Sequence, residues 1–115
     1  MGPELNNIVR ELQKSLATLY GERLVKIMLY GSQARGDAEP GADIDVLVVL
    51  EGETNSAEEI ERSSSILSPL SLNYNVVISC VFMDAHRFTS RNGPLLRNIR
   101  KEGIPVYDRR PAGTP

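Results

Sequence analysis

Apolar residues near the N-terminus recur every three or four positions, which is the spacing of one face of an α-helix. The set consists of Leu5, Ile8, Leu12, Leu16 and Leu19. Gly21 follows, and a glycine relieves the left-handed strain that often closes a helix. The pattern then changes, because residues 24–30 form a short run of mostly aliphatic side chains. We therefore expect a helix followed by a buried strand.

A second aliphatic run starts with two acidic residues. Residues 43–50 read Asp-Ile-Asp-Val-Leu-Val-Val-Leu, which is typical of a buried strand. Ser56 and Glu59 then form the pattern of a capping box, so a second helix is expected to begin there. Pro69 is expected to kink or end that helix, because proline lacks the backbone donor that a helix interior uses.

The last third of the chain predicts a third strand and two short helices. The apolar run in residues 73–83 is continuous enough to predict a central strand in a sheet covered on both faces. Asp84 is expected to cap a short helical turn. Pro94 suits the first position of another helix, which Gly103 would end. Residues 104–107 predict a small edge strand.

These elements follow the order α-β-β-α-β-α-(β), which predicts an α/β or α+β fold with a mixed β-sheet flanked by helices. The chain has 115 residues, the size of one ordinary domain. We expect residues 1–107 to form a single domain and residues 108–115 to form a flexible tail.

Composition excludes several classes of protein. Thirteen Lys and Arg against fifteen Asp and Glu give a net charge of −2, which argues against binding to bulk nucleic acid. One cysteine cannot form an internal disulfide or a thiolate metal site. The N-terminal residues do not resemble a signal peptide, and no apolar run is long enough to span a membrane. We therefore expect a single soluble domain in the cytoplasm.

Gly31 and Ser32 follow the first expected strand and are candidates for binding an anion. Glycine lets the backbone turn sharply and come close to a ligand. Ser32 and the amides after it then lie where a helical turn would begin, with free N–H groups that suit phosphate oxygens. By itself, such a Gly-Ser pair is more often a simple turn.

Asp43 and Asp45 strengthen the functional interpretation. Side chains two residues apart in a strand point to the same face, roughly 6–7 Å apart along the chain. Two carboxylates on one face repel each other, and a divalent cation with oxygen ligands, Mg²⁺ or Mn²⁺, offsets that repulsion. For Asp43 alone a turn or cap is an equally good interpretation, whereas Asp45 lies inside the aliphatic run. A phosphate cradle facing two carboxylates is the arrangement that phosphoryl-type transfer requires.

The spacing of these residues resembles a known signature. Gly31 and Ser32, ten further residues and then Asp43 and Asp45 match the G-S-x10-D-x-D pattern of nucleotidyltransferases similar to DNA polymerase β. Arg35 lies in the G-S-x-A-R-G form of that pattern, and the chain looks like the small branch, the minimal nucleotidyltransferases. The resemblance implies a mixed sheet flanked by helices, ATP as the substrate and one or two Mg²⁺ ions.

The resemblance also implies a role for each matched residue. Gly31 and Ser32 would hold the triphosphate. Arg35 would reach the γ-phosphate or the acceptor, and its place in the pattern favours this over a solvated loop arginine. Asp43 and Asp45 would bind the metal ion and carry the catalysis.

Small stand-alone members of this family are commonly antitoxins paired with an all-helical HEPN ribonuclease toxin. The resemblance therefore implies transfer of a nucleoside monophosphate, AMP from ATP, to a tyrosine hydroxyl of such a partner, with an assembly of the two proteins.

One feature of the family pattern is missing. The family usually places a third carboxylate on the strand after the crossover helix, but residues 71–83 contain no Asp or Glu. Asn73 and Asn75 are the nearest polar residues, and Asp84 is more simply a helix cap. This departure favours an alternative, in which a catalytically weak or inactive nucleotide-binding module neutralises its partner by contact alone.

Overall fold

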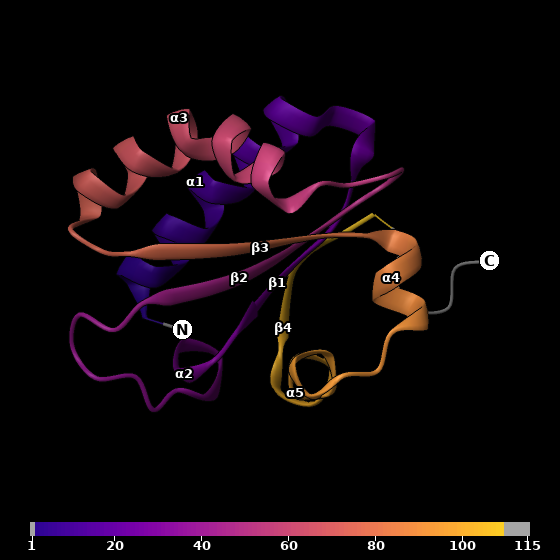
Figure 1. The fold of residues 1–115 in the computed structure, drawn as a ribbon. Coiled ribbons are helices and arrows are strands. Elements are labelled where there is room, and N and C mark those ends of the chain that lie inside the picture. The colour runs from indigo at the N-terminus through magenta and orange to yellow at the C-terminus, as the bar shows by residue number, and fades with distance from the viewer. Residues whose placement is uncertain (1, 110–115) are drawn as a thin grey trace.

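The computed structural model describes residues 2–109 and shows a four-stranded sheet with helices on both faces (Figure 1). The elements are α1 (Pro3–Tyr20), the short 3-10 helix η1 (Gly21–Arg23), β1 (Leu24–Tyr30), α2 (Ser32–Arg35), β2 (Ile44–Leu50), α3 (Ser56–Tyr74), β3 (Ile78–Asp84), α4 (Ala85–Ser90), α5 (Pro94–Glu102) and β4 (Ile104–Asp108). The expected α+β class is confirmed. No helix among the described residues combines the length and the apolar character that a membrane crossing requires.

The C-terminal boundary of the fold lies slightly beyond the expected one. β4 ends at Asp108, and the backbone N–H of Arg109 donates to the carbonyl of Val25 at 2.9 Å. The tail expected to start at residue 108 therefore begins inside the sheet. The remainder of that expected tail, residues 110–115, lies outside the described residues.

The sheet is mixed, with the strand order β3-β2-β1-β4. β1 runs antiparallel to both β2 and β4, whereas β2 and β3 are parallel and joined by the crossover helix α3. The expectation that the third strand is central is wrong, because β3 lies at an edge. β3 is apolar because helices pack against both of its faces. That cover makes a strand hydrophobic without giving it a neighbour on each side.

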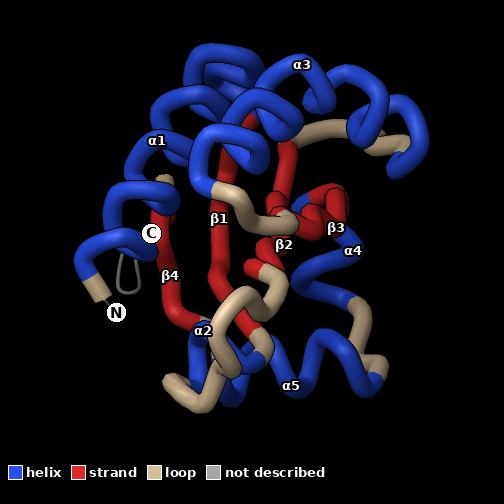
Figure 2. The backbone as a smooth tube through the Cα atoms, turned by 90° about the vertical axis from the view of Figure 1, so that its left-hand side faces the viewer, coloured by secondary structure: helices blue, strands red, loops and turns tan. Residues whose placement is uncertain are grey.

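The two faces of β2 contact different helices. Ile44, Val46, Val48 and Leu50 pack into the core that contains α1 and α3. Leu47 and Val49 pack into a second core on the other face, with residues of α4 and α5. Figure 2 shows α1 and α3 at one side of the strands and α2 and α5 at the other. Because side chains alternate along a strand, Asp45 faces the same side as Leu47.

α1 confirms the periodicity of the N-terminal segment. Ile8, Leu12 and Leu16 are buried on the face that packs against the sheet. The helix ends at Gly21, whose φ of +54° lies in the region where glycine avoids the strain of a side chain.

The start of α3 differs from the expected capping box. The N-cap is Asn55, whose side chain accepts a hydrogen bond from the amide of Glu58 at 3.1 Å. Ser56 instead donates its hydroxyl to the carbonyl of Phe82 at 3.2 Å. Glu59 turns into the protein. The sequence pattern placed the cap one residue late because both Asn and Ser are good N-cap residues.

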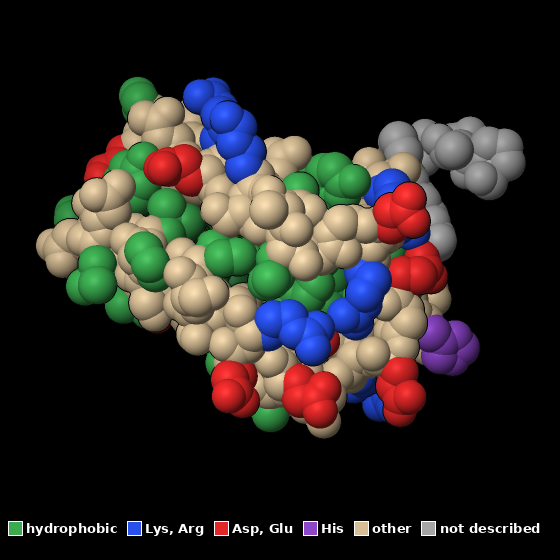
Figure 3. All heavy atoms as spheres, turned by 90° about the horizontal axis from the view of Figure 1, so that it is seen from above, with side chains coloured by type: hydrophobic (Ala, Val, Ile, Leu, Met, Phe, Trp, Pro, Cys, Tyr) green, Lys and Arg blue, Asp and Glu red, His purple; other side chains and the backbone are tan. Residues whose placement is uncertain are grey.

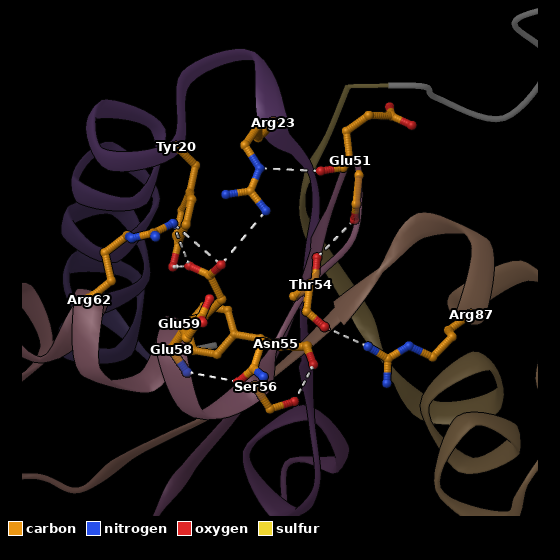
Figure 4. A network of polar contacts seen from close by, with 12 residues as sticks. Tyr20, Arg23, Glu51, Thr54, Asn55, Ser56, Glu58, Glu59, Arg62 and Arg87 are labelled. Carbon is orange, nitrogen blue, oxygen red and sulfur yellow. Dashed lines mark hydrogen bonds and ion pairs between the residues drawn. The ribbon is translucent and has the colours of Figure 1, made fainter.

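Glu59 is the centre of a buried polar network that joins α1 to α3 (Figure 4). Its side chain is 3% exposed and accepts hydrogen bonds from Tyr20 at 2.9 Å and Arg62 at 3.0 Å. Arg23 lies 3.7 Å from the same carboxylate. Burial and the neighbouring Glu59 raise the pKa of Tyr20 above its ordinary range. The network fixes the end of the sheet opposite to α2.

α3 continues through Pro69 to Tyr74, so an end of the helix at that residue, one of the two outcomes expected there, is wrong. Proline removes one helical hydrogen bond and crowds the preceding turn. Pro69 is exposed, and so is Ser65, whose carbonyl would otherwise accept from the backbone N–H that proline lacks, so that carbonyl is accessible to water. The buried Leu70 beside it anchors the helix to the core.

The C-terminal helices begin as the sequence predicts. The carboxylate of Asp84 accepts a hydrogen bond from the amide of Arg87 at 2.7 Å and caps α4. The guanidinium of Arg87 also donates to the carbonyl of Thr54 at 2.7 Å, which ties α4 to the loop before α3. Pro94 starts α5, and Gly103 follows its end.

Candidate active site

Asp43 and Asp45 lie at the start of β2, on the side of the sheet that α5 covers. Asp45 pairs with Tyr30 of β1 and, across the parallel ladder, with Ser79 of β3. Asp45 is half-buried, whereas Asp43 is exposed just before the strand. Asp43 lies outside the strand, but its charge raises the pKa of Asp45, so the two carboxylates are close enough to interact.

Gly31 touches the second of these carboxylates. Its φ of +74° favours glycine, and a Cβ built on it would lie 2.5 Å from Oδ2 of Asp45. A side chain at this position would therefore displace the carboxylate or the backbone. The close approach joins the expected phosphate cradle to the expected metal ligand.

The cradle consists of Gly31 and the short helix α2. The amides of Ala34 and Arg35 both donate to the carbonyl of Gly31 at 3.1 Å, so the backbone turns at once into a helix. The first amides of a helix, here those of Ser32 and Gln33, have no partner within it. They are the donors that the sequence analysis assigned to phosphate oxygens.

A side chain that the sequence analysis did not single out holds the cradle near the carboxylates. Gln33 donates from Nε2 to the carbonyl of Ala42 at 3.3 Å, across the loop between α2 and β2. Ala42 directly precedes Asp43. The contact joins residues nine positions apart in a loop, and no local pattern in the sequence indicates it.

The electrostatics of the pair indicate a site for a cation. Burial and, to a lesser extent, the charge of Asp43 raise the pKa of Asp45. Within residues 2–109, neither carboxylate takes part in an ion pair or hydrogen bond, whereas Asp37 and Asp84 are both paired with arginines. Two unpaired carboxylates beside a phosphate cradle fit a hard divalent ion, which takes one or two carboxylates plus substrate phosphates.

Arg35 is paired on the surface. Its guanidinium lies 3.2 Å from Asp37 and 3.2 Å from Glu102 of α5, and its side chain is 43% exposed. The contact with Glu102 links α2 to the end of α5. These two contacts use Nε and Nη1, so Nη2 is left to donate to a phosphate oxygen of a bound nucleotide.

On β3, the strand after the crossover helix, Ser79 is the residue that pairs with Asp45. Asn73 lies in the last turn of α3 and Asn75 is its C-cap, so neither belongs to the sheet. Asp84 pairs with Leu50 at the far end of β3 and caps α4. In the described part of the chain, no three His, Cys, Asp or Glu side chains gather as a metal site requires.

The chain matches known proteins by sequence. The family model of the nucleotidyltransferase domain matches residues 9–107. A Methanocaldococcus jannaschii protein, MJ0604, which bears the provisional name of a protein adenylyltransferase, is 33% identical over 100 residues. That alignment covers 86% of this chain and 94% of the relative.

Solved structures share the fold. A tri-AMPylated Shewanella oneidensis HEPN toxin in complex with its MNT antitoxin contains a chain with a TM-score of 0.60 and 18% identity, covering 89% of this chain and 71% of that one. Spectinomycin adenyltransferase from Enterococcus faecialis, crystallised with ATP and spectinomycin, gives a TM-score of 0.72 at 15% identity, covering 90% and 56%. The family model, the curated relative and the shared fold agree with the resemblance read from Gly31, Ser32, Asp43 and Asp45, and the chain belongs to the nucleotidyltransferase domain family.

Proposed function

We propose that this protein transfers AMP from ATP to a tyrosine hydroxyl of a HEPN-type toxin and thereby acts as an antitoxin in the cytoplasm. The observation that carries the proposal is the close approach of Gly31, in the phosphate cradle, to the unpaired carboxylate of Asp45. A Cβ built on Gly31 would lie only 2.5 Å from Oδ2 of Asp45. The relative that bears the name of a protein adenylyltransferase supports the reaction type, and the AMPylated toxin complex supports the partner.

The reaction assigns a role to each residue of the site. The acceptor oxygen forms a bond to the α-phosphorus, the bond between the α- and β-phosphates breaks, pyrophosphate leaves and the hydroxyl proton passes to water. Gly31 and Ser32 hold the triphosphate through backbone amides, and Arg35 contacts it through the guanidinium N–H groups that Asp37 and Glu102 do not occupy. Asp43 and Asp45 would hold Mg²⁺, or Mn²⁺ in its place. The bound ion would neutralise charge that develops on the phosphates.

The second candidate is neutralisation of the partner by contact alone. Ser79 beside Asp45 favours it, because a serine hydroxyl neither carries the charge of a carboxylate nor acts as a base at neutral pH. If AMP transfer does occur without a third carboxylate, its rate would come mainly from the partner, which holds the acceptor hydroxyl in position. Such positioning alone lowers a reaction barrier by roughly 7 kcal/mol or more.

Mass spectrometry of a HEPN-type protein co-expressed with this protein separates the two candidates. Transfer predicts partner molecules carrying added AMP with the parent protein and none with the Asp43→Ala/Asp45→Ala double variant. An unmodified partner that is still neutralised by the double variant would establish the contact mechanism.

Ser79→Asp gives a second measurement for the same question. If the metal site lacks only its third carboxylate, this variant binds Mn²⁺ more tightly and transfers AMP faster, while Ser79→Asn does neither. Calorimetry with Mn²⁺ reports the first effect without depending on activity.

A further inference from the structure

A long uncharged segment follows the first half of α3. Residues 63–83 contain no Asp, Glu, Lys, Arg or His, although 24% of the chain is charged and about five charged residues would be expected in 21 positions. The segment includes the second half of α3 and nearly all of β3. Depletion of charge, rather than overall hydrophobicity, distinguishes the centre of a protein interface from other surface.

This uncharged segment exposes large apolar side chains. Leu72 is 82% exposed and Val77 is 56% exposed, the highest values among the exposed large hydrophobic residues of the described chain. Both lie where α3 ends and β3 begins, the end of the molecule at the left of Figure 1. Figure 3 shows that end largely as hydrophobic and uncharged side chains. We call the surface formed by Ser71, Leu72, Asn75, Val76 and Val77 the α3–β3 surface.

The α3–β3 surface is hollowed and has an acidic edge. A hollow of about 200 Å³ is lined by Gly41, Ser71, Leu72, Asn75, Val76 and Val77. A neighbouring hollow shares Gly41 and Val76 with it and is also lined by Glu4 and Glu39. Asp43 adds a further negative charge beside it. The complementary partner surface therefore has an apolar centre with Lys or Arg at its edge.

The α3–β3 surface adjoins the carboxylates on the side away from the nucleotide. The amide of Ile44 donates to the carbonyl of Val77 at 2.8 Å, so Val77 lies beside Asp43. The phosphate cradle approaches the same carboxylates from β1, on the opposite side of β2. Because β3 is an edge strand, no further strand of the described sheet lies between the carboxylates and an acceptor on the β3 side.

The geometry points to the α3–β3 surface as the docking site of the protein acceptor, a protein whose contact face has an apolar centre and a basic edge. This inference rests on the proposed function, since it places the acceptor hydroxyl beside Asp43 and Asp45. A small polar acceptor gains little from exposed Leu72 and Val77, whereas a protein surface buries both.

A paired set of variants tests the docking site. Leu72→Arg/Val77→Asn places charge and polarity in the apolar centre. The matched control, Ile60→Arg/Leu95→Asn, changes two other exposed apolar residues, on the first half of α3 and on α5. The probe is a purified HEPN-type protein that is first shown to bind the parent protein. Its affinity is measured by calorimetry, together with MgATP affinity and circular dichroism of each variant.

We expect Leu72→Arg/Val77→Asn to bind the HEPN-type protein at least tenfold more weakly, with MgATP affinity within twofold of the parent. The control should stay within twofold for both ligands. Leu72→Arg alone, at a side chain already in solvent, serves as a second variant that leaves folding intact and is expected to weaken binding in the same direction.

Two results would contradict the assignment of the α3–β3 surface as the docking site. A third would support that assignment while contradicting the proposed AMP transfer. Unchanged partner affinity in Leu72→Arg/Val77→Asn contradicts the assignment. A parent that is dimeric by light scattering while that variant is monomeric assigns the surface to a second copy instead. A parent that binds the partner through this surface but adds no AMP supports the docking site and contradicts the transfer reaction.

Discussion

Asp45 is a residue whose charge works against the fold. Burial and the neighbouring Asp43 raise the pKa of its carboxyl above the ordinary value. An acid with a raised pKa binds its proton more tightly in the folded state. The free energy of unfolding therefore falls as pH rises through the interval between the unfolded and folded pKa values, and the loss persists above it. A cation near Asp45 would remove that loss.

Asp45→Asn is expected to change stability and binding in opposite directions. The amide carries no charge, so the variant should be more stable than the parent at pH 7 and lose the advantage under acidic conditions. Loss of a charged ligand should weaken MgATP binding by about 1.5–3 kcal/mol. Urea denaturation at several pH values and calorimetry measure the two effects. Equal MgATP affinity in parent and variant would remove Asp45 from the metal site.

Gly31 lets the backbone come close to the carboxylate of Asp45. Replacing Gly31 tests whether this close approach is needed for nucleotide binding. Gly31→Ala places a methyl group 2.5 Å from the present position of Asp45 Oδ2 and imposes a positive φ on alanine. We expect a loss of about 1–2 kcal/mol of stability from the backbone conformation and at least a tenfold loss of MgATP affinity.

Gly36→Ala is the matched control for Gly31, because Gly36 also has a positive φ but its Cβ would meet open space. The control should lose stability without a comparable loss of nucleotide affinity. If both variants bind MgATP alike, the contact with Asp45 has no part in binding.

At the scale of single elements, helix α3 shows what a sequence pattern does and does not contain. The pattern locates the start of the helix within one residue, because several good N-cap residues follow one another at Asn55 and Ser56. It places the end at Pro69, five residues early, because propensity treats proline as a terminator. Packing of Leu70 against the core outweighs that local preference.

Pro69→Ala tests this conflict between the low helix propensity of proline and the packing of the helix. Alanine restores a helical hydrogen bond and removes the crowding of the previous turn, so the variant should be more stable by about 1–3 kcal/mol. Chemical denaturation measures the change, and Ser68→Ala, also exposed and one residue away, should alter stability by only a few tenths of a kcal/mol. No gain from Pro69→Ala would mean that the helix is already open at this turn.

At the scale of the whole molecule, the sequence predicts the class of the fold and the core of the site, but not the contacts between distant segments. The spacing of Gly31, Ser32, Asp43 and Asp45 is local in the chain, so a linear pattern captures it. The pairing of Asp45 with Ser79 depends on the register of two parallel strands separated by a 19-residue helix. The edge position of β3 and the contact of Arg35 with Glu102 likewise arise only when the sheet assembles.

The network around Glu59 is another contact between distant segments, and Tyr20→Phe tests it. The phenol donates to Glu59 across 39 residues, and burial raises its pKa. The variant should lose about 1 kcal/mol of stability at pH 7. The parent should lose stability as pH rises above about 10, because ionisation of Tyr20 is disfavoured in the fold, and Tyr20→Phe should show less of that loss. Equal stability at pH 7 would show that the hydrogen bond adds nothing, and equal pH profiles would show that folding does not raise the pKa of Tyr20.

The length of β2 has a consequence for how this protein tolerates change. The strand carries Asp45 near one end, and the chain leaves its other end toward Thr54, Asn55 and Glu59. Seven residues of strand span roughly 20 Å. Substitutions that far apart, with no shared partner, usually have additive effects. Mutations that strengthen or weaken the Glu59 network should therefore shift the melting temperature and leave nucleotide affinity alone, so this end of the sheet can change stability without changing the chemistry at Asp45.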